Sequence, residues 1–183
     1  MTAVSTSTDR LLLSRPTPGD AAGMYAICSD PRVWTHFPSL RHTAQSQTAA
    51  MLDGFTARWE QDGLAPWVVR AQGEPAIIGQ GGCSIKAGVY WNLGYRFSAD
   101  VHGRGYATEL SREAVRQAKA LRPELPIVAY LLEHNAASAR VAEKLGLTLV
   151  HRGPDAGNPD PAAVRLVYAD RPLGPEQLAA TLA

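Results

Sequence analysis

The sequence has few cysteines, no long apolar run and almost no net charge. Its only two cysteines, Cys28 and Cys83, lie far apart, so the chain lacks a disulfide framework and is expected in the reducing cytoplasm. No apolar run approaches a membrane span, and the start, MTAVSTSTDR, lacks the regions of a signal peptide. With 18 Lys and Arg against 17 Asp and Glu, the net charge is +1. We therefore expect neither a nucleic acid nor a membrane as partner.

Length and composition favour one domain. The chain has 183 residues, of which 45% are hydrophobic, enough for one sizeable core. We expect a disordered tail at residues 1–9, one domain at residues 10–170 and a C-terminal extension at residues 171–183. The five histidines, at positions 36, 42, 102, 134 and 151, show no paired metal-ligand spacing. No metal site is therefore expected.

Hydrophobic periodicity predicts the secondary structure. Strand-like patterns occur at residues 10–17, 64–71, 76–85, 89–99, 126–132, 147–153 and 162–169. Helical patterns occur at residues 17–30, 43–63, about 103–121 and 135–146, with an irregular loop at residues 31–42. The third helix carries one apolar stripe, formed by Leu110, Ala114, Ala118 and Leu121. This order predicts an α+β layered fold with one mixed central β-sheet flanked by helices.

Two glycines stand between a predicted strand and the third helix, in the segment HGRGYAT. Backbone N–H groups in the first turn of a helix have no intrahelical partner, and glycine lets an anion approach them. The segment could therefore hold a pyrophosphate, or it could be only a tight turn with glycine at positive φ. It lacks the GK[ST] ending of a P-loop and the complete fingerprint of a dinucleotide-binding unit.

A second cluster follows in EHNAASARVAEKLG. Asn135 is suited to cap a helix, and Ser138 lies in the first turn of that helix. Both residues have simple structural explanations when taken alone. Two helix N-termini that each follow a strand would nevertheless form a cleft, with anion donors at one end and side-chain amides along it.

Together, NLGYRFSADVHGRGYATEL and NAASARVAEKLG resemble the acetyl-CoA-binding core of the GNAT superfamily of N-acetyltransferases, in its RimJ/RimL-like branch. The resemblance covers roughly residues 8 to 170. It implies a GNAT-like sheet, acetyl-CoA as cofactor with coenzyme A as product, and no metal. The acceptor would be a primary amine, on a protein N-terminus or a small molecule, and a homodimer is left open.

The resemblance also implies roles for cofactor-binding residues. The backbone of one strand segment would pair with the pantetheine, and Asn135 would hydrogen-bond the same arm. The glycine loop would hold the pyrophosphate. The strand residues are Tyr95, Arg96 and Phe97, and the loop residues are His102, Gly103, Arg104, Gly105, Tyr106, Ala107 and Thr108. Ser138 is also expected to contact the cofactor.

The catalytic residues are less well defined by the resemblance. The tyrosine that many family members use as the acid is Ala142 here, and the RimL-like branch points instead to Ser138. A glutamate used as base in wider relatives corresponds to Tyr130. Glu133 is the first candidate for the base. His134, Asp155, Asp160 and a chain of water molecules remain open.

The acceptor pocket is expected to use the loop at residues 31–42, the end of the second helix and the late strands. Trp34 and Phe37 are its candidate walls, because they lie outside any periodic element. Two other classes of function stay open. One is a module that senses acetyl-CoA and has lost catalysis, and the other is an unrelated nucleotide-binding α/β protein.

Overall fold

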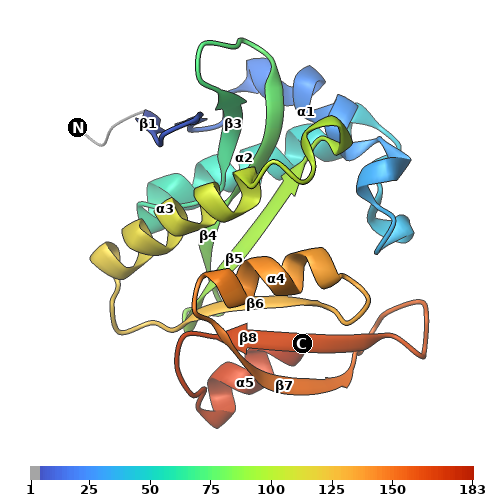
Figure 1. The fold of residues 1–183 in the computed structure, drawn as a ribbon, viewed down its shortest axis with the longest axis vertical. Helices are drawn as coiled ribbons and strands as arrows, with labels where there is room; N and C mark the ends of the chain where they lie inside the picture. The colour runs from blue at the N-terminus through green and yellow to red at the C-terminus, as the bar shows by residue number, and fades with distance from the viewer. Residues whose placement is uncertain (1–4) are drawn as a thin grey trace.

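One eight-stranded sheet organises the chain, in the order β1-β2-β3-β4-β5-β6-β8-β7 (Figure 1). The structure, a computed structural model, describes residues 5–183. The strands are β1 (Ser5–Ser7), β2 (Leu11–Ser14), β3 (Trp67–Ala71), β4 (Ile77–Lys86), β5 (Tyr90–Phe97), β6 (Ile127–Leu132), β7 (Thr148–Pro154) and β8 (Val164–Ala169). The α-helices are α1 (Ala21–Cys28), α2 (Gln45–Asp62), α3 (Tyr106–Leu121), α4 (Ala136–Lys144) and α5 (Pro175–Leu182).

The sheet is antiparallel except where β5 and β6 run parallel. Their pairing is short, since only Trp91 with Ile127 and Asn92 with Val128 are in register. Beyond these pairs the two strands diverge, as Figure 1 shows. The prediction of a mixed central sheet is confirmed, and its parallel pair opens into a gap.

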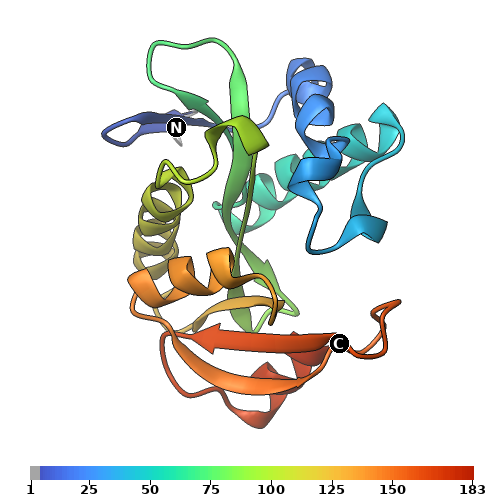
Figure 2. The same cartoon turned by 45° about the vertical axis from the view of Figure 1, so that its right-hand side comes forward.

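Helices cover both faces of the sheet. Figure 2 shows the sheet nearly edge-on, with α3 on one side and α1 and α2 on the other. Leu110 and Ala114 of α3 are fully buried in the main core together with Trp91. This burial follows from the apolar stripe, because one face of the helix meets one face of the strands.

Leu121 departs from the predicted stripe, with 47% of its surface exposed. It is the last residue of α3, and Figure 1 shows this end of the helix extending past the strands. The helical phase of Leu121 is correct, but no strand lies beneath it.

Both ends of the domain contribute more structure than the sequence predicts. Residues 5–7 form β1, paired with β2, so the tail prediction is wrong for them, and residues 1–4 lie outside the described residues.

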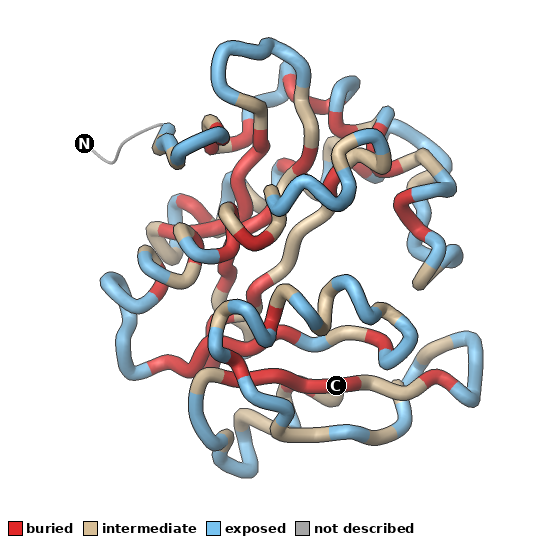
Figure 3. The backbone as a smooth tube through the Cα atoms, viewed as in Figure 1, coloured by how far each residue is buried: buried red, intermediate tan, exposed pale blue. Residues whose placement is uncertain are grey.

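At the other end, α5 packs against the core: Arg165 Nη1 donates to the Thr181 carbonyl at 2.6 Å and Gln177 to the Val89 carbonyl at 3.3 Å. Figure 3 shows the buried strand segments of this region beside α5. In residues 5–183 no helix is long and apolar enough to cross a membrane.

Candidate active site

The gap between β5 and β6 leaves part of the β5 edge free. The Trp91 N–H points toward β6 and donates to the Pro126 carbonyl at 2.9 Å. Because strand residues alternate, the N–H groups of Leu93, Tyr95 and Phe97 face the same edge. The Leu93 N–H completes the pairing with Val128, and those of Tyr95 and Phe97 lie beyond it. Arg96 faces β4 instead, opposite Gln80. Of the three predicted strand residues, Tyr95 and Phe97 therefore present backbone groups to the gap.

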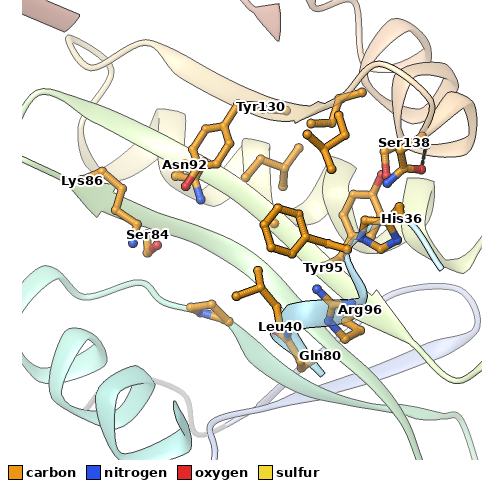
Figure 4. Close-up of a pocket in the computed structure, with 18 of the residues that line it drawn as sticks. His36, Leu40, Gln80, Ser84, Lys86, Asn92, Tyr95, Arg96, Tyr130 and Ser138 are labelled. Atoms are coloured by element: carbon orange, nitrogen blue, oxygen red, sulfur yellow. Dashed lines mark hydrogen bonds between the residues drawn. The ribbon is translucent and has the colours of Figure 1, made fainter. Parts of the chain in front are cut away.

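A pocket of about 700 Å³ lies at this gap and is lined from both faces of the sheet (Figure 4). On the face covered by α3 and α4, which we call the α4 side, its polar lining includes Tyr95, Asn135 and Ser138. On the face covered by α1 and α2, which we call the α2 side, the lining includes His36 and Phe37. Two molecules could therefore meet at the gap from opposite faces.

The floor of the α2 side is hollowed by two facing glycines. Gly82 pairs with Gly94 across β4 and β5, between the pairs Ser84 with Asn92 and Gln80 with Arg96. A Cβ on Gly94 would meet only the Asn92 amide nitrogen, at 3.9 Å. A Cβ on Gly82 would come within 2.9 Å of the Pro66 Cα, at φ +155. Gly82 therefore allows a close backbone approach, and Gly94 leaves open space in the pocket.

The glycine loop before α3 is an open turn. Gly103 and Gly105 have φ values of +78 and +80, as the turn interpretation predicts, and a Cβ on Gly103 would meet nothing within 4 Å. No group in the described part of the chain accepts a backbone hydrogen bond from the N–H groups of residues 103–108. His102 uses its ring Nε2 to contact the Phe97 carbonyl at 3.1 Å. The loop thus combines the turn with a row of free donors suited to an anion.

Arg10 contacts this loop and the first turn of α3, although no local sequence pattern indicates it. Its Nη1 donates to the Arg104 carbonyl at 2.9 Å and its Nε to Glu109 at 2.7 Å. Burial alone would raise the pKa of Glu109, but hydrogen bonds from Thr8 and Arg10 outweigh burial and lower it. Arg10 thereby compensates the carboxylate in the first turn of α3, and the Arg104 side chain adds positive charge beside the free donors.

At the start of α4, the Asn135 side chain accepts a hydrogen bond from the Ser138 N–H at 3.2 Å. Figure 4 shows the Tyr95 side chain directed toward Ser138. Burial raises the pKa of Tyr95, and a hydrogen bond with Ser138 opposes that rise in part. The pocket therefore holds two adjacent hydroxyl groups on the α4 side. The sequence indicated Ser138, but it indicated Tyr95 only through its backbone.

Glu133 does not lie in the pocket, which corrects its prediction as the base. Its carboxylate forms a bidentate pair with Arg152 at 2.6 and 3.0 Å. Hydrogen bonding to Arg152 lowers the pKa of Glu133, which makes it a poorer base, and it is absent from the pocket lining.

The other predicted base candidates have structural partners too. His134 contacts the His36 carbonyl at 3.0 Å, and neither it nor Asp160 lines the pocket. Asp155 does line the pocket, but Arg165 pairs with it. Within residues 5–183 no group of three or more His, Cys, Asp or Glu side chains could hold a metal ion.

His36 is a basic group in the pocket that sequence analysis missed. Desolvation, followed by the positive charge of Arg96, lowers its pKa below 6.5. The imidazole is therefore neutral at pH 7 and able to accept a proton. His36 lies in the loop without clear periodicity, where no pattern separates a pocket residue from a solvent-exposed one.

Trp34 does not line the pocket, and its prediction as a wall is corrected. Its side chain is buried, and its indole N–H donates to the Cys28 carbonyl. The Arg96 guanidinium lies 3.3 Å from the Trp34 ring centroid and does line the pocket. Desolvation lowers the pKa of Arg96 to about 10, so it stays charged at neutral pH. Trp34 supports Arg96 by a cation–π contact, whereas Phe37 lines the pocket as predicted.

Comparisons with known proteins agree with this architecture. Residues 10–148 match the family model of the acetyltransferase (GNAT) domain. The uncharacterised protein YkkB of Bacillus subtilis is 27% identical over 149 residues, which cover 76% of this chain and 83% of YkkB. A putative GnaT-family acetyltransferase from Bordetella pertussis has a TM-score of 0.76 at 17% identity, covering 91% of this chain and 99% of the other. The ribosomal L7/L12 alpha-N-protein acetyltransferase RimL, in complex with coenzyme A, has a TM-score of 0.72 at 19% identity, covering 92% and 96%.

Proposed function

The chain belongs to the GNAT acetyltransferase family, and from this premise we propose that it transfers the acetyl group of acetyl-CoA directly to a primary amine. The observation that carries the proposal is the pocket at the β5–β6 gap, lined from both faces of the sheet. Such a site lets a thioester enter from one face and an amine from the other, which is the proximity that a direct transfer needs.

Acetyl-CoA would occupy the α4 side. The free N–H groups of residues 103–108, with Arg104, suit its pyrophosphate. The unpaired β5 edge suits the pantetheine, with Asn135 beside it. The free β5 N–H of Tyr95 would stabilise the oxyanion that forms at the thioester carbonyl. The structurally similar RimL was solved in complex with coenzyme A, which supports the use of acetyl-CoA.

The amine would enter from the α2 side, where His36 is the base. A protonated amine must lose a proton before it attacks, and a neutral imidazole in the pocket can accept that proton. The positive charge of Arg96 also favours the neutral form of a nearby amine. The amine nitrogen then bonds to the carbonyl carbon, and the carbon–sulfur bond breaks.

The leaving thiolate would be protonated on the α4 side. Ser138 is the proposed donor, and its neighbour Tyr95 would replace the proton that Ser138 gives up. Many family members have a tyrosine acid at the position of Ala142, and Tyr95 would act in its place here. Acid and base then act from opposite faces of the sheet, as a transfer across the gap requires.

A sensor of acetyl-CoA without catalysis is the second candidate, favoured by Ala142 in place of the family's tyrosine acid. Release of free thiol from acetyl-CoA, measured across a panel of amines and short peptides, separates the two. We expect amine-dependent release, with acetylated product confirmed by mass spectrometry. Acetyl-CoA should also raise the melting temperature far more than pantetheine, which has no pyrophosphate. Strong acetyl-CoA binding without thiol release from any amine would favour the sensor.

A further inference from the structure

We propose that the acceptor amine also carries an anionic group, a carboxylate or phosphate, which binds at the end of the pocket formed by Arg58, Ser84, Lys86 and Asn92. We call these four residues the anion subsite. The inference rests on the proposed function, because it names the substrate class of the same pocket. It concerns only the α2 side, away from the glycine loop.

The charges that line the pocket are unbalanced. Its cations are Arg58, Lys86, Arg96 and Arg165, and its only carboxylate is Asp155. Arg165 pairs with Asp155, whereas no ion pair within residues 5–183 involves the other three cations. Uncompensated cations around a partly desolvated cavity favour an anionic ligand.

Two of these cations lie close together. Lys86 is half-buried, and desolvation, followed by the nearby charge of Arg58, lowers its pKa. Like charges repel each other when no anion lies between them, so a bound anion would relieve this repulsion. The backbone at Lys86 is also well anchored, because Lys86 ends β4 at a three-residue turn, residues 87–89, in which Ala87 and Gly88 have φ values of +49 and +73.

Neutral donors complete the anion subsite. Ser84 is 6% exposed and pairs across the strands with Asn92. Neither side chain forms a hydrogen bond with any residue in the described part of the chain, although both line the pocket. Figure 4 shows Ser84, Lys86 and Asn92 together at one end of the pocket, with His36, Tyr95 and Ser138 at the other. Four unpartnered donor groups therefore converge on one end of the cavity.

The length of the strand sets the spacing between the two groups of the acceptor. Asn92 precedes Gly94 and Tyr95, near which the transfer would occur, by two and three residues. At strand spacing this corresponds to about 7–10 Å. An acceptor that spans this distance has several carbon atoms between amine and anion. A simple α-amino acid is too short, whereas longer ω-amino acids, aminoalkyl phosphates and short acidic peptides fit.

The test compares acceptors that differ only in charge. We would measure kcat/KM for β-alanine, γ-aminobutyrate and ε-aminocaproate against the corresponding carboxamides. O-phosphoethanolamine against ethanolamine provides the phosphate pair, and glycyl peptides with free or amidated C-termini provide the peptide pair. Among the ω-amino acids, ε-aminocaproate spans about 7–10 Å when extended, and we expect it to react at least about 10-fold better than its carboxamide. The preference should shrink toward β-alanine, whose chain is too short. Equal rates for anionic and neutral members would overturn the proposal.

Variants link that preference to the anion subsite. Lys86→Gln should lower kcat/KM for the carboxylate about 10-fold or more and change the carboxamide little, and Lys86→Arg should keep much of the preference. The matched control is Arg112→Gln, an exposed α3 arginine outside the pocket lining, which should change neither. If Lys86→Gln lowers both acceptors equally, Lys86 has only a structural role and the proposal fails.

Failure of the proposed function would look different. If no amine in any pair is acetylated, the proposed acetyl transfer is refuted. The anion subsite is then tested by calorimetry, which measures the binding of each carboxylate and its carboxamide to the acetyl-CoA complex. A carboxylate that binds more tightly than its carboxamide, with the difference lost in Lys86→Gln, would support the subsite. Equal binding of the two would overturn it.

Discussion

Replacement of Gly94 by alanine tests where the acceptor binds with little disturbance to the fold. The new Cβ would project into the pocket from the middle of β5, where the nearest atom is the Asn92 amide nitrogen at 3.9 Å. Gly94 is not among the glycines with positive φ, so alanine adopts the same backbone without strain. The change therefore adds one methyl group to the cavity and little else.

The expected magnitudes follow from this geometry. A glycine in a strand interior is destabilising by about 0.5–1 kcal/mol relative to alanine, so Gly94→Ala should be as stable as the native chain or slightly more stable. A methyl group in a filled binding site costs about 1–3 kcal/mol, which corresponds to roughly 5- to 150-fold in kcat/KM. We expect activity to fall while stability does not.

The assay pairs kinetics with stability. We would measure kcat/KM for the best acceptor, the acetyl-CoA Kd by calorimetry, and the free energy of unfolding in urea. Gly82→Ala is the matched control, because its Cβ would lie 2.9 Å from the Pro66 Cα at φ +155, and it should lose stability. Full activity in Gly94→Ala would refute the position of the acceptor over Gly94. A large loss of stability in that variant would refute the geometry of the open floor.

Two further predictions test the proton transfers. Ser138→Ala should lower the single-turnover rate on the order of 10²-fold with the acetyl-CoA Kd nearly unchanged, because the hydroxyl acts on the leaving thiolate; a full rate would leave Ser138 a structural residue. Since the pKa of His36 lies below 6.5, kcat should be constant near neutral pH and fall as the pH drops through that lowered pKa and the imidazole becomes protonated. His36→Gln should lower kcat and abolish this acid limb, and an unchanged pH profile would exclude His36 as the base.

Sequence patterns predicted the elements that depend on local interactions. The helix at Tyr106–Leu121 follows from its apolar stripe and the two glycines before it, and α4 follows from the Asn135 cap, which the structure contains. Helix caps and positive-φ glycines act over a few residues, so the sequence reports them directly. The order of the predicted strands and helices was enough to predict a mixed sheet. The divergence of β5 from β6 could not, because it depends on where pairing stops.

The parts of the site that were missed depend on contacts between distant segments. Arg10 meets Glu109 across 99 positions, and Glu133 meets Arg152 across 19. The local sequence around a carboxylate at the end of a strand is the same whether or not a distant arginine pairs with it. The sequence therefore could not reveal that Glu133 is occupied, or that His36 enters the pocket from a loop without periodicity.

This difference explains why the ligands of the two sides of the pocket can be inferred in unequal detail. The α4 side consists mainly of backbone: a free strand edge, a glycine turn and a capped helix, whose ability to bind an anion and an extended chain follows from peptide geometry. The α2 side consists of side chains from α2, β4, β5 and a loop, and side chains specify one ligand among many. Backbone features thus point to acetyl-CoA whatever the acceptor, and only the unpaired charges of Arg58, Lys86 and Arg96 carry information about the acceptor. A comparison of anionic with neutral amines is therefore more informative than a wider survey of amines.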